Sequence, residues 1–276
     1  NMGFWGGYFY LEPQACYLAI SALLSVFLLL TFNREQDRKW RLVVYSIMLL
    51  CLLFFLSLTV TKGAIIAFVL GFLTLGICSW KMLSWYRKWL LIGFACLGIG
   101  VGIFSLSGVF SARYNDFKSE LLKITQGDVS LGGGTTSFRL MLWKENFKHI
   151  DEFGIWGLGV YKKTCTEEWY KNTPGANNAH NSFIEYWVSG GILGLCFIFY
   201  YFLAPIFRMR KQNSWSALVV AIIVTLFVAN NSCVLIILVD SAPFVILLLE
   251  LCFLYAVKFS EFEKSSLTKL QIDNER

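Results

Sequence analysis

Long apolar runs constrain this sequence more than any other feature. Several of them reach the length of about 20 residues that a helix needs to cross about 30 Å of hydrocarbon. Of the 276 residues, 57% are apolar and 15% are charged. A soluble domain has about 45–50% apolar and about 25% charged residues, so the excess must face something other than water, and lipid is the simplest answer. The sequence therefore predicts an all-α polytopic membrane protein.

We expect about seven transmembrane helices, with directions set by the basic residues between them. Short loops rich in Lys and Arg lie on the cytoplasmic side of a membrane. Such clusters follow the first, third and fifth apolar runs, and they comprise Arg34, Arg38, Lys39 and Arg41, then Lys81, Arg87 and Lys88, then Arg208, Arg210 and Lys211. The expected spans are about 14–32, 42–60, 64–80, 89–106, 183–204, 215–229 and 234–257.

This topology divides the chain into four parts. Residues 1–106 form the N-terminal membrane helices, with about four spans, and residues 183–257 form the last three. Between them, residues 107–182 are the only long polar region, which the alternation places outside the cytoplasm as one large loop. Residues 258–276 form a cytoplasmic tail. A loop of this length is not bound by the positive-inside rule, so its basic residues do not contradict the placement.

Several functional classes are disfavoured by composition. The net charge of +6 comes from short clusters between apolar runs, which set topology and do not indicate a nucleic-acid surface. The eight cysteines include no CxxC pair, so neither a zinc site nor a disulfide framework is indicated. The triple glycine at 132–134 is not followed by the Lys and Ser or Thr of a phosphate-binding loop.

The stretch 179–205 carries the most informative polar residues. It begins as a polar loop containing His180 and Asn181 and continues directly into an apolar run. Imidazole takes up and releases a proton near neutral pH, so His180 at a water–lipid boundary is suited to a substrate that is part lipid and part sugar. Alternatively, His180 and Asn181 only cap the following helix, because polar residues are common at helix N-termini.

The outer loop contributes a second candidate group. We expect a helix over 138–150, capped by Thr135, Thr136 or Ser137, which places Arg139 in its first turn. A guanidinium beside the unpaired N–H groups of a helix start suits a phosphate, and the alternative is a solvated surface arginine. For His149, in the same helix, we expect a structural role. The aromatic residues that follow fit either a sugar-binding surface or the bilayer interface.

These residues resemble a known family. His180-Asn181, then nine residues, then Gly191-x-x-Gly194 is similar to the motif of the O-antigen ligases and Wzy-type O-antigen or capsule polymerases of bacterial inner membranes. The segments TTSFRLMLW and GIWGLGVYKK resemble further parts of that pattern, and the resemblance covers roughly residues 59–203. In these two segments the matching residues are Arg139, Trp143, Gly157 and Gly159.

The chain departs from the family pattern in one place. The family usually has Ser-Arg-Gly-Ala where this chain has Thr61-Lys62-Gly63-Ala64, and a lysine cannot form a bidentate fork with phosphate. Such proteins commonly have ten or more spans. Because the expected topology places residue 1 outside the cytoplasm, an odd number of helices is expected before it.

The resemblance implies a metal-independent glycosyltransferase without a cofactor. Its donor would be an undecaprenyl-diphosphate-linked oligosaccharide, and its acceptor a glycan or the lipid A core. His180 would activate the acceptor hydroxyl, while Arg139 and Lys62 would hold the diphosphate and stabilise the leaving group. Further expected substrate-binding residues are Arg113, Lys162, Lys163 and Asn181, and Gly191 and Gly194 are expected to be structural. A chain-length regulator and membrane lipid are expected partners, and nucleic acid is not. The alternatives are a secondary transporter or flippase of lipid-linked oligosaccharide, and a non-catalytic scaffold.

Overall fold

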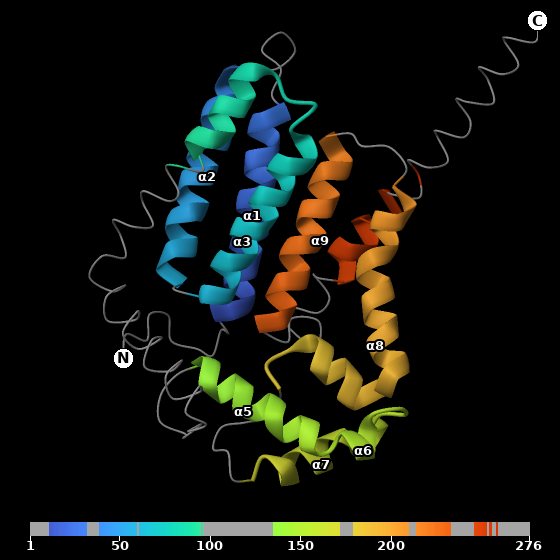
Figure 1. Ribbon diagram of the computed structural model, residues 1–276. Helices are drawn as coiled ribbons and strands as arrows, with labels where there is room; N and C mark the ends of the chain where they lie inside the picture. Colours follow the sequence, from blue (N-terminus) through green and yellow to red (C-terminus); the bar gives the residue numbers. More distant parts are fainter. Residues whose placement is uncertain are drawn as a thin grey trace, which may run out of the picture. The chain divides into compact units, whose positions relative to one another are not determined.

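The structure of the chain is a computed structural model. It describes residues 11–31, 39–59, 61–94, 96, 135–171, 179–209, 214–232, 246–252, 254, 255 and 258. Within these ranges every regular element is helical, which confirms the all-α class (Figure 1). The chain forms two compact units. Unit 1 comprises residues 1–84, 204–229 and 235–276, and unit 2 comprises residues 85–203 and 230–234.

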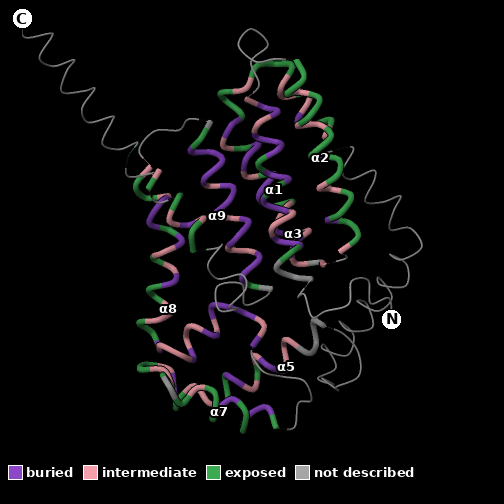
Figure 2. Tube along the Cα trace, turned by 180° about the vertical axis from the view of Figure 1, so that it is seen from behind, coloured by how far each residue is buried: buried purple, intermediate pink, exposed green. Residues whose placement is uncertain are grey.

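Unit 1 consists of long apolar helices lying alongside one another. They are α1 (Leu11–Thr31), α2 (Lys39–Thr59), α3 (Lys62–Ser79) and most of α9 (Ser214–Ser232). Helix α1 contributes much of the buried surface, including Leu23 and Phe27, whereas much of α2 is exposed (Figure 2). Gly71 of α3 lies close to Thr225 of α9, since a Cβ at position 71 would be 1.9 Å from the Thr225 hydroxyl. A small residue here lets the two helices approach closely.

Three helices are long and apolar enough to cross a membrane. They cover Gln14–Thr31, Lys39–Thr59 and Ser182–Arg208, and they correspond to the expected first, second and fifth spans. Shorter apolar helices, Gly63–Ser79 and Trp215–Asn231, correspond to the third and sixth. Most of the expected fourth and seventh spans and the first part of the outer loop lie outside the described residues. The count of seven and the sidedness therefore stay predictions.

Unit 2 combines several short helices with most of α8, residues 182–203. The short helices are α5 (Thr135–Lys148), α6 (Ile150–Phe153), the 3-10 turn η1 (Gly159–Tyr161) and α7 (Lys162–Trp169). Their buried core contains Leu142, Phe153, Trp169, Tyr170 and Val188. Helix α5 begins at Thr135, so Thr136 and Ser137 lie inside it and cannot be its cap. Arg139 accordingly lies in the second turn and not in the first, farther from the unpaired N–H groups than the sequence indicates.

Helix α8 is not the single straight span that the apolar run predicts. It extends over Ser182–Arg208 and is bent (Figure 1), and Gly191 interrupts it there with φ 61° and ψ −156°. This backbone conformation is essentially restricted to glycine. A short helical segment, 182–190, therefore precedes the bend, and a longer segment, 192–208, follows it. The polar residues at the start of α8 all belong to the first segment.

Candidate functional site

His180 occupies a strained position directly before α8. Its φ of 49° lies in the left-handed region, and it is the one non-glycine residue in the described part of the chain with a positive φ. Side chains with a Cβ adopt this conformation rarely, and it persists where the surroundings hold the backbone in place. The contacts of the neighbouring residues 179 and 181–185 contribute to holding this backbone in place.

Asn181 caps helix α8. Its side-chain oxygen accepts hydrogen bonds from the N–H groups of Phe183 at 2.9 Å and Ile184 at 3.2 Å. These are two of the N–H groups that the first turn of a helix leaves without a backbone partner. Its Nδ2 donates to the carbonyl of Asn231 at 3.4 Å. Of the two roles that the sequence leaves open for this residue, capping is confirmed, and substrate binding stays a prediction.

The next residue, Ser182, joins the start of α8 to the end of α9. Its hydroxyl donates to Oδ1 of Asn230 at 2.7 Å, and both side chains are fully buried. Burial of two polar groups is tolerated when they bond to each other. Together with the contact between Asn181 and Asn231, this bond fixes the first turn of α8 within unit 2.

Ala179 is held on both sides of its backbone. The indole N–H of Trp143, on α5, donates to its carbonyl at 2.8 Å. Its own N–H donates to Oε1 of Glu185, on α8, at 2.5 Å. Arg139 lies four residues before Trp143 on α5, and this spacing places both on one face of the helix. The residue before His180 is thus bonded to the helix that carries Arg139.

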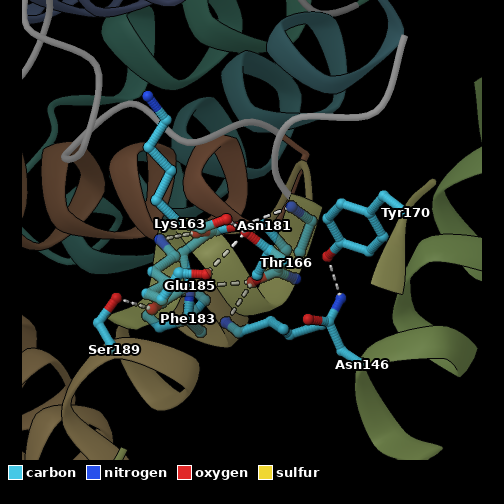
Figure 3. Close-up of polar contacts among 11 residues, drawn as sticks. Asn146, Lys163, Thr166, Tyr170, Asn181, Phe183, Glu185 and Ser189 are labelled. Carbon is cyan, nitrogen blue, oxygen red and sulfur yellow. Dashed lines mark hydrogen bonds and ion pairs between the residues drawn. The ribbon is translucent and has the colours of Figure 1, made fainter. Parts of the chain in front are cut away.

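Glu185 is the site residue that sequence reasoning missed. Its side chain is 2% exposed, and its second carboxylate oxygen, Oε2, forms an ion pair with Nζ of Lys162 on α7. Figure 3 shows Glu185 among the polar contacts at the start of α8. The available signal was an acidic residue inside a largely apolar run, a pattern that marks functional sites in membrane proteins.

The Gly-x-Gly turn packs against the bend in α8. The N–H of Leu158 donates to the Val188 carbonyl at 2.8 Å, and the N–H of Ile192 donates to the Ile155 carbonyl at 3.1 Å. A Cβ on Gly191 would lie 2.0 Å from that Ile155 oxygen, and one on Gly157 would lie 2.4 Å from the nitrogen of Gly191. Two glycine motifs that are distant in sequence therefore meet backbone to backbone.

Contacts of Asn146 and His149 support the core of unit 2. Nδ2 of Asn146 donates to the Tyr170 hydroxyl at 2.5 Å, and burial raises the pKa of Tyr170 well above its ordinary value (Figure 3). His149 stacks on Trp169 with ring centroids 4.4 Å apart and contacts Glu152 at 2.6 Å through Nδ1. These contacts agree with the structural role expected for His149.

The remaining expected site residues are distributed as follows. Lys163 is exposed and extends away from the Glu185 contacts, 4.0 Å from Glu167 (Figure 3). A Cβ on Gly194 would be 2.7 Å from the Tyr186 carbonyl, which agrees with a packing role. Lys62 is the first residue of α3, but its side chain lies outside the described part, as does all of Arg113.

Comparison with known proteins gives one result. The protein-family model Wzy_C, described as O-Antigen ligase, matches residues 47–199, which is more than half of the chain. The matched range includes Arg139, Trp143, His180 and Glu185. Among the curated proteins compared, none matches the chain.

Proposed function

Because the chain belongs to the O-antigen ligase family, we propose that it transfers a glycan from an undecaprenyl-diphosphate carrier to an acceptor sugar hydroxyl. Family membership implies a membrane-located enzyme of the glycosyltransferase type with a role in surface polysaccharide formation. The observation that carries the proposal is the fixed backbone at Ala179, beside His180. The bonds from Trp143 and Glu185 hold the segment that bears the candidate base.

In the proposed reaction, His180 is the general base. Its imidazole accepts the proton of the acceptor hydroxyl while the hydroxyl oxygen attacks the anomeric carbon of the donor. The bond between that carbon and the diphosphate oxygen breaks, and undecaprenyl diphosphate leaves. Proton transfer to a positioned base contributes about 10²–10⁴-fold to a rate.

Positive charge stabilises the leaving group in this proposal. Arg139 is placed on the same helix as Trp143, and its guanidinium can form two parallel hydrogen bonds with a phosphate. Lys62, Arg113 and Lys163 are further candidates for the diphosphate, and Asn181 for the glycan. The diphosphate is already a good leaving group, so the proposed reaction proceeds without a metal ion.

The proposal includes a location and a topology. The donor lipid would lie among about seven spans of the bacterial inner membrane, and the loop 107–182 would face away from the cytoplasm. The three long apolar helices support a membrane location. The acceptor is a growing glycan if the protein is a polymerase, and the lipid A core if it is a ligase.

The glycan made by cells tests this function. A strain that lacks the protein is complemented with wild type, His180→Ala or Arg139→Ala, and the surface glycan is separated on a gel. His149→Gln and Lys148→Met are matched controls from the same unit, since they change a histidine and a half-exposed lysine outside the proposed chemistry. Protein amounts in the membrane are measured for each variant.

Each outcome has a defined meaning. Loss of the ladder with one repeat unit retained on the lipid core indicates a polymerase. Loss of all surface glycan with accumulation of lipid-linked chains indicates a ligase. Wild-type ladders in both the His180 and Arg139 variants would overturn the enzymatic function and favour a transporter, a flippase or a scaffold.

A further inference from the structure

Burial of the Glu185 carboxylate is energetically unfavourable, and contacts with neighbouring groups offset this cost. Of the residues that the structure describes, Glu185 is the one charged side chain that is buried. Removing a carboxylate from water is strongly unfavourable unless the group is paired and hydrogen-bonded. Here each carboxylate oxygen has its own partner, Oε1 the Ala179 N–H and Oε2 the Lys162 ammonium.

The first of these contacts closes a ring around His180. Ala179 and Glu185 are six residues apart, and the bond between them encloses His180 and the Asn181 cap. The Ala179 carbonyl is held at the same time by Trp143. Loss of the Glu185 oxygen would leave the buried Ala179 N–H without this acceptor and release the backbone that holds His180 in its left-handed conformation.

The second contact assigns a role to Lys162. The lysine stands at the start of α7, and its ammonium is in direct contact with Oε2 of Glu185. Its positive charge is therefore already used to balance a buried negative one. Removal of only one member of a buried pair leaves the other charge without compensation, which is far more damaging than removal of both.

We propose that Glu185 is a positioning residue for His180 and that Lys162 is the counter-ion of Glu185, not a ligand of the diphosphate. This inference rests on the proposed role of His180 and goes beyond it. Glu185 does not touch the substrate. It acts through the Ala179 N–H, and Lys162 acts through Glu185.

Two double variants isolate the contact to Ala179. Glu185→Gln with Lys162→Met removes both charges but keeps a side-chain oxygen that can accept from the Ala179 N–H. Glu185→Met with Lys162→Met removes both charges and that acceptor, with a side chain of similar length. The single variant Lys162→Met leaves Glu185 buried without its counter-ion. Glu167→Gln, an exposed carboxylate on α7, is the matched control.

The assay uses the full chain in lipid nanodiscs and lipid-linked oligosaccharide extracted from the strain that lacks the protein. We expect Lys162→Met and the Met double variant to lose at least about tenfold in kcat with KM for the donor unchanged, the signature of an interaction that acts in the transition state. The Gln double variant is expected to regain kcat to within about threefold of wild type, because the Ala179 N–H keeps its acceptor and no charge is stranded.

Other results would overturn the proposal. Equal kcat values for the two double variants would show that the acceptor for Ala179 is irrelevant. If Lys162→Met raises the KM for the donor, and adding Glu185→Gln does not lower it again, Lys162 binds the donor. If the Met double variant is not recovered as folded protein, the Gln double variant is the deciding measurement. Activity near wild type supports the proposal, and activity as low as that of Lys162→Met overturns it.

His180→Ala in the same preparation distinguishes a failure of the proposed function from a failure of the positioning role of Glu185. If it transfers glycan as fast as wild type, the proposed function fails whatever the Glu185 series shows. If it is inactive while the Gln double variant is not restored, only the positioning role fails.

Discussion

The two units satisfy their polar groups in different ways. In unit 1, hydroxyls of the apolar helices bond to their own helix: Ser25 donates to the Ser21 carbonyl at 2.9 Å and Thr225 to the Ala221 carbonyl at 2.8 Å. Unit 2 also has bonds within one helix, such as that from Ser189 to the Glu185 carbonyl, but others join distant parts of the chain. Trp143 reaches Ala179, 36 residues away, and Ser182 reaches Asn230, 48 residues away.

This difference follows from the kinds of helix in each unit. A helix in lipid must satisfy its polar groups internally, because no water is available there. The short helices of unit 2 are too short to be stable alone and depend on contacts with one another. Single polar contacts should therefore matter in unit 2, while unit 1 should tolerate the loss of a hydroxyl. Four measurements test this contrast, in order of decreasing expected effect.

Gly191→Ala should have the largest effect. The added Cβ would meet the Ile155 carbonyl at 2.0 Å in a conformation that only glycine adopts readily. The strained backbone alone costs about 1–3 kcal/mol, and the clash adds to this. We expect loss of glycan transfer and a markedly lower thermal unfolding midpoint in detergent.

Gly190→Ala is the matched control for that variant. A Cβ at position 190 has open space within 4 Å. Alanine is favoured over glycine within helices by about 1 kcal/mol, so the variant should be at least as stable as wild type. Equal midpoints for the two alanine variants would contradict the packing of the Gly-x-Gly turn on the bend.

Ser182→Ala should have the second largest effect. It leaves the buried Asn230 without this donor, and an unsatisfied buried group costs about 1–3 kcal/mol. Ser25→Ala in α1 removes a buried hydroxyl whose bond lies within its own helix, so the Ser21 carbonyl keeps its backbone partner and the loss of stability should be smaller. The thermal unfolding midpoints of the two variants compare the units directly. Equal shifts would show that the units do not differ in their dependence on single polar contacts.

Asn181→Ala should have a smaller effect. Replacing a helix cap of this type by alanine costs about 1 kcal/mol, and Asn181→Asp keeps the oxygen that accepts from Phe183 and Ile184. We expect the alanine variant to unfold at a lower temperature and the aspartate variant to stay near wild type. The same low midpoint in both would indicate that the contact with Asn231 dominates.

The smallest effect should come from alkaline pH acting on Tyr170. Burial raises its pKa in the folded state, while an unfolded tyrosine titrates at about 10. Above that pH the unfolded state loses the proton first, so the folded state is progressively disfavoured as pH rises. The unfolding midpoint should fall from about pH 10 upward, and less steeply in Tyr170→Phe. Identical slopes in both proteins would exclude this residue as the cause.

Much of the helical framework was predictable from sequence. The expected spans 14–32, 42–60 and 64–80 correspond to α1, α2 and α3 with ends shifted by up to three residues. The reason is physical, since an apolar run of this length has few alternatives to a helix in lipid. The motif around His180 also located the start of α8.

The bend and the buried ion pair were not predictable. Gly190-Gly191 marks a possible break in the run, but glycine pairs also occur in closely packed straight helices, and only the Ile155 carbonyl placed beside Gly191 distinguishes the two. Glu185 and Lys162 are 23 positions apart and belong to different helices, and no spacing rule connects them. Contacts of this kind depend on tertiary structure, and the roles of His180 and Arg139 stay predictions for the same reason.

The backbone contact between Gly157 and Gly191 also limits how this protein can change over generations. Every missense mutation at either codon introduces a Cβ, and a second mutation at the partner position only adds to the crowding. Compensation within the pair is thus excluded, in contrast to the ion pair of Glu185 and Lys162, whose two charges we expect to be removable together. In a selection from a saturated variant library, positions 157 and 191 should each return glycine alone, while position 190 should also return alanine.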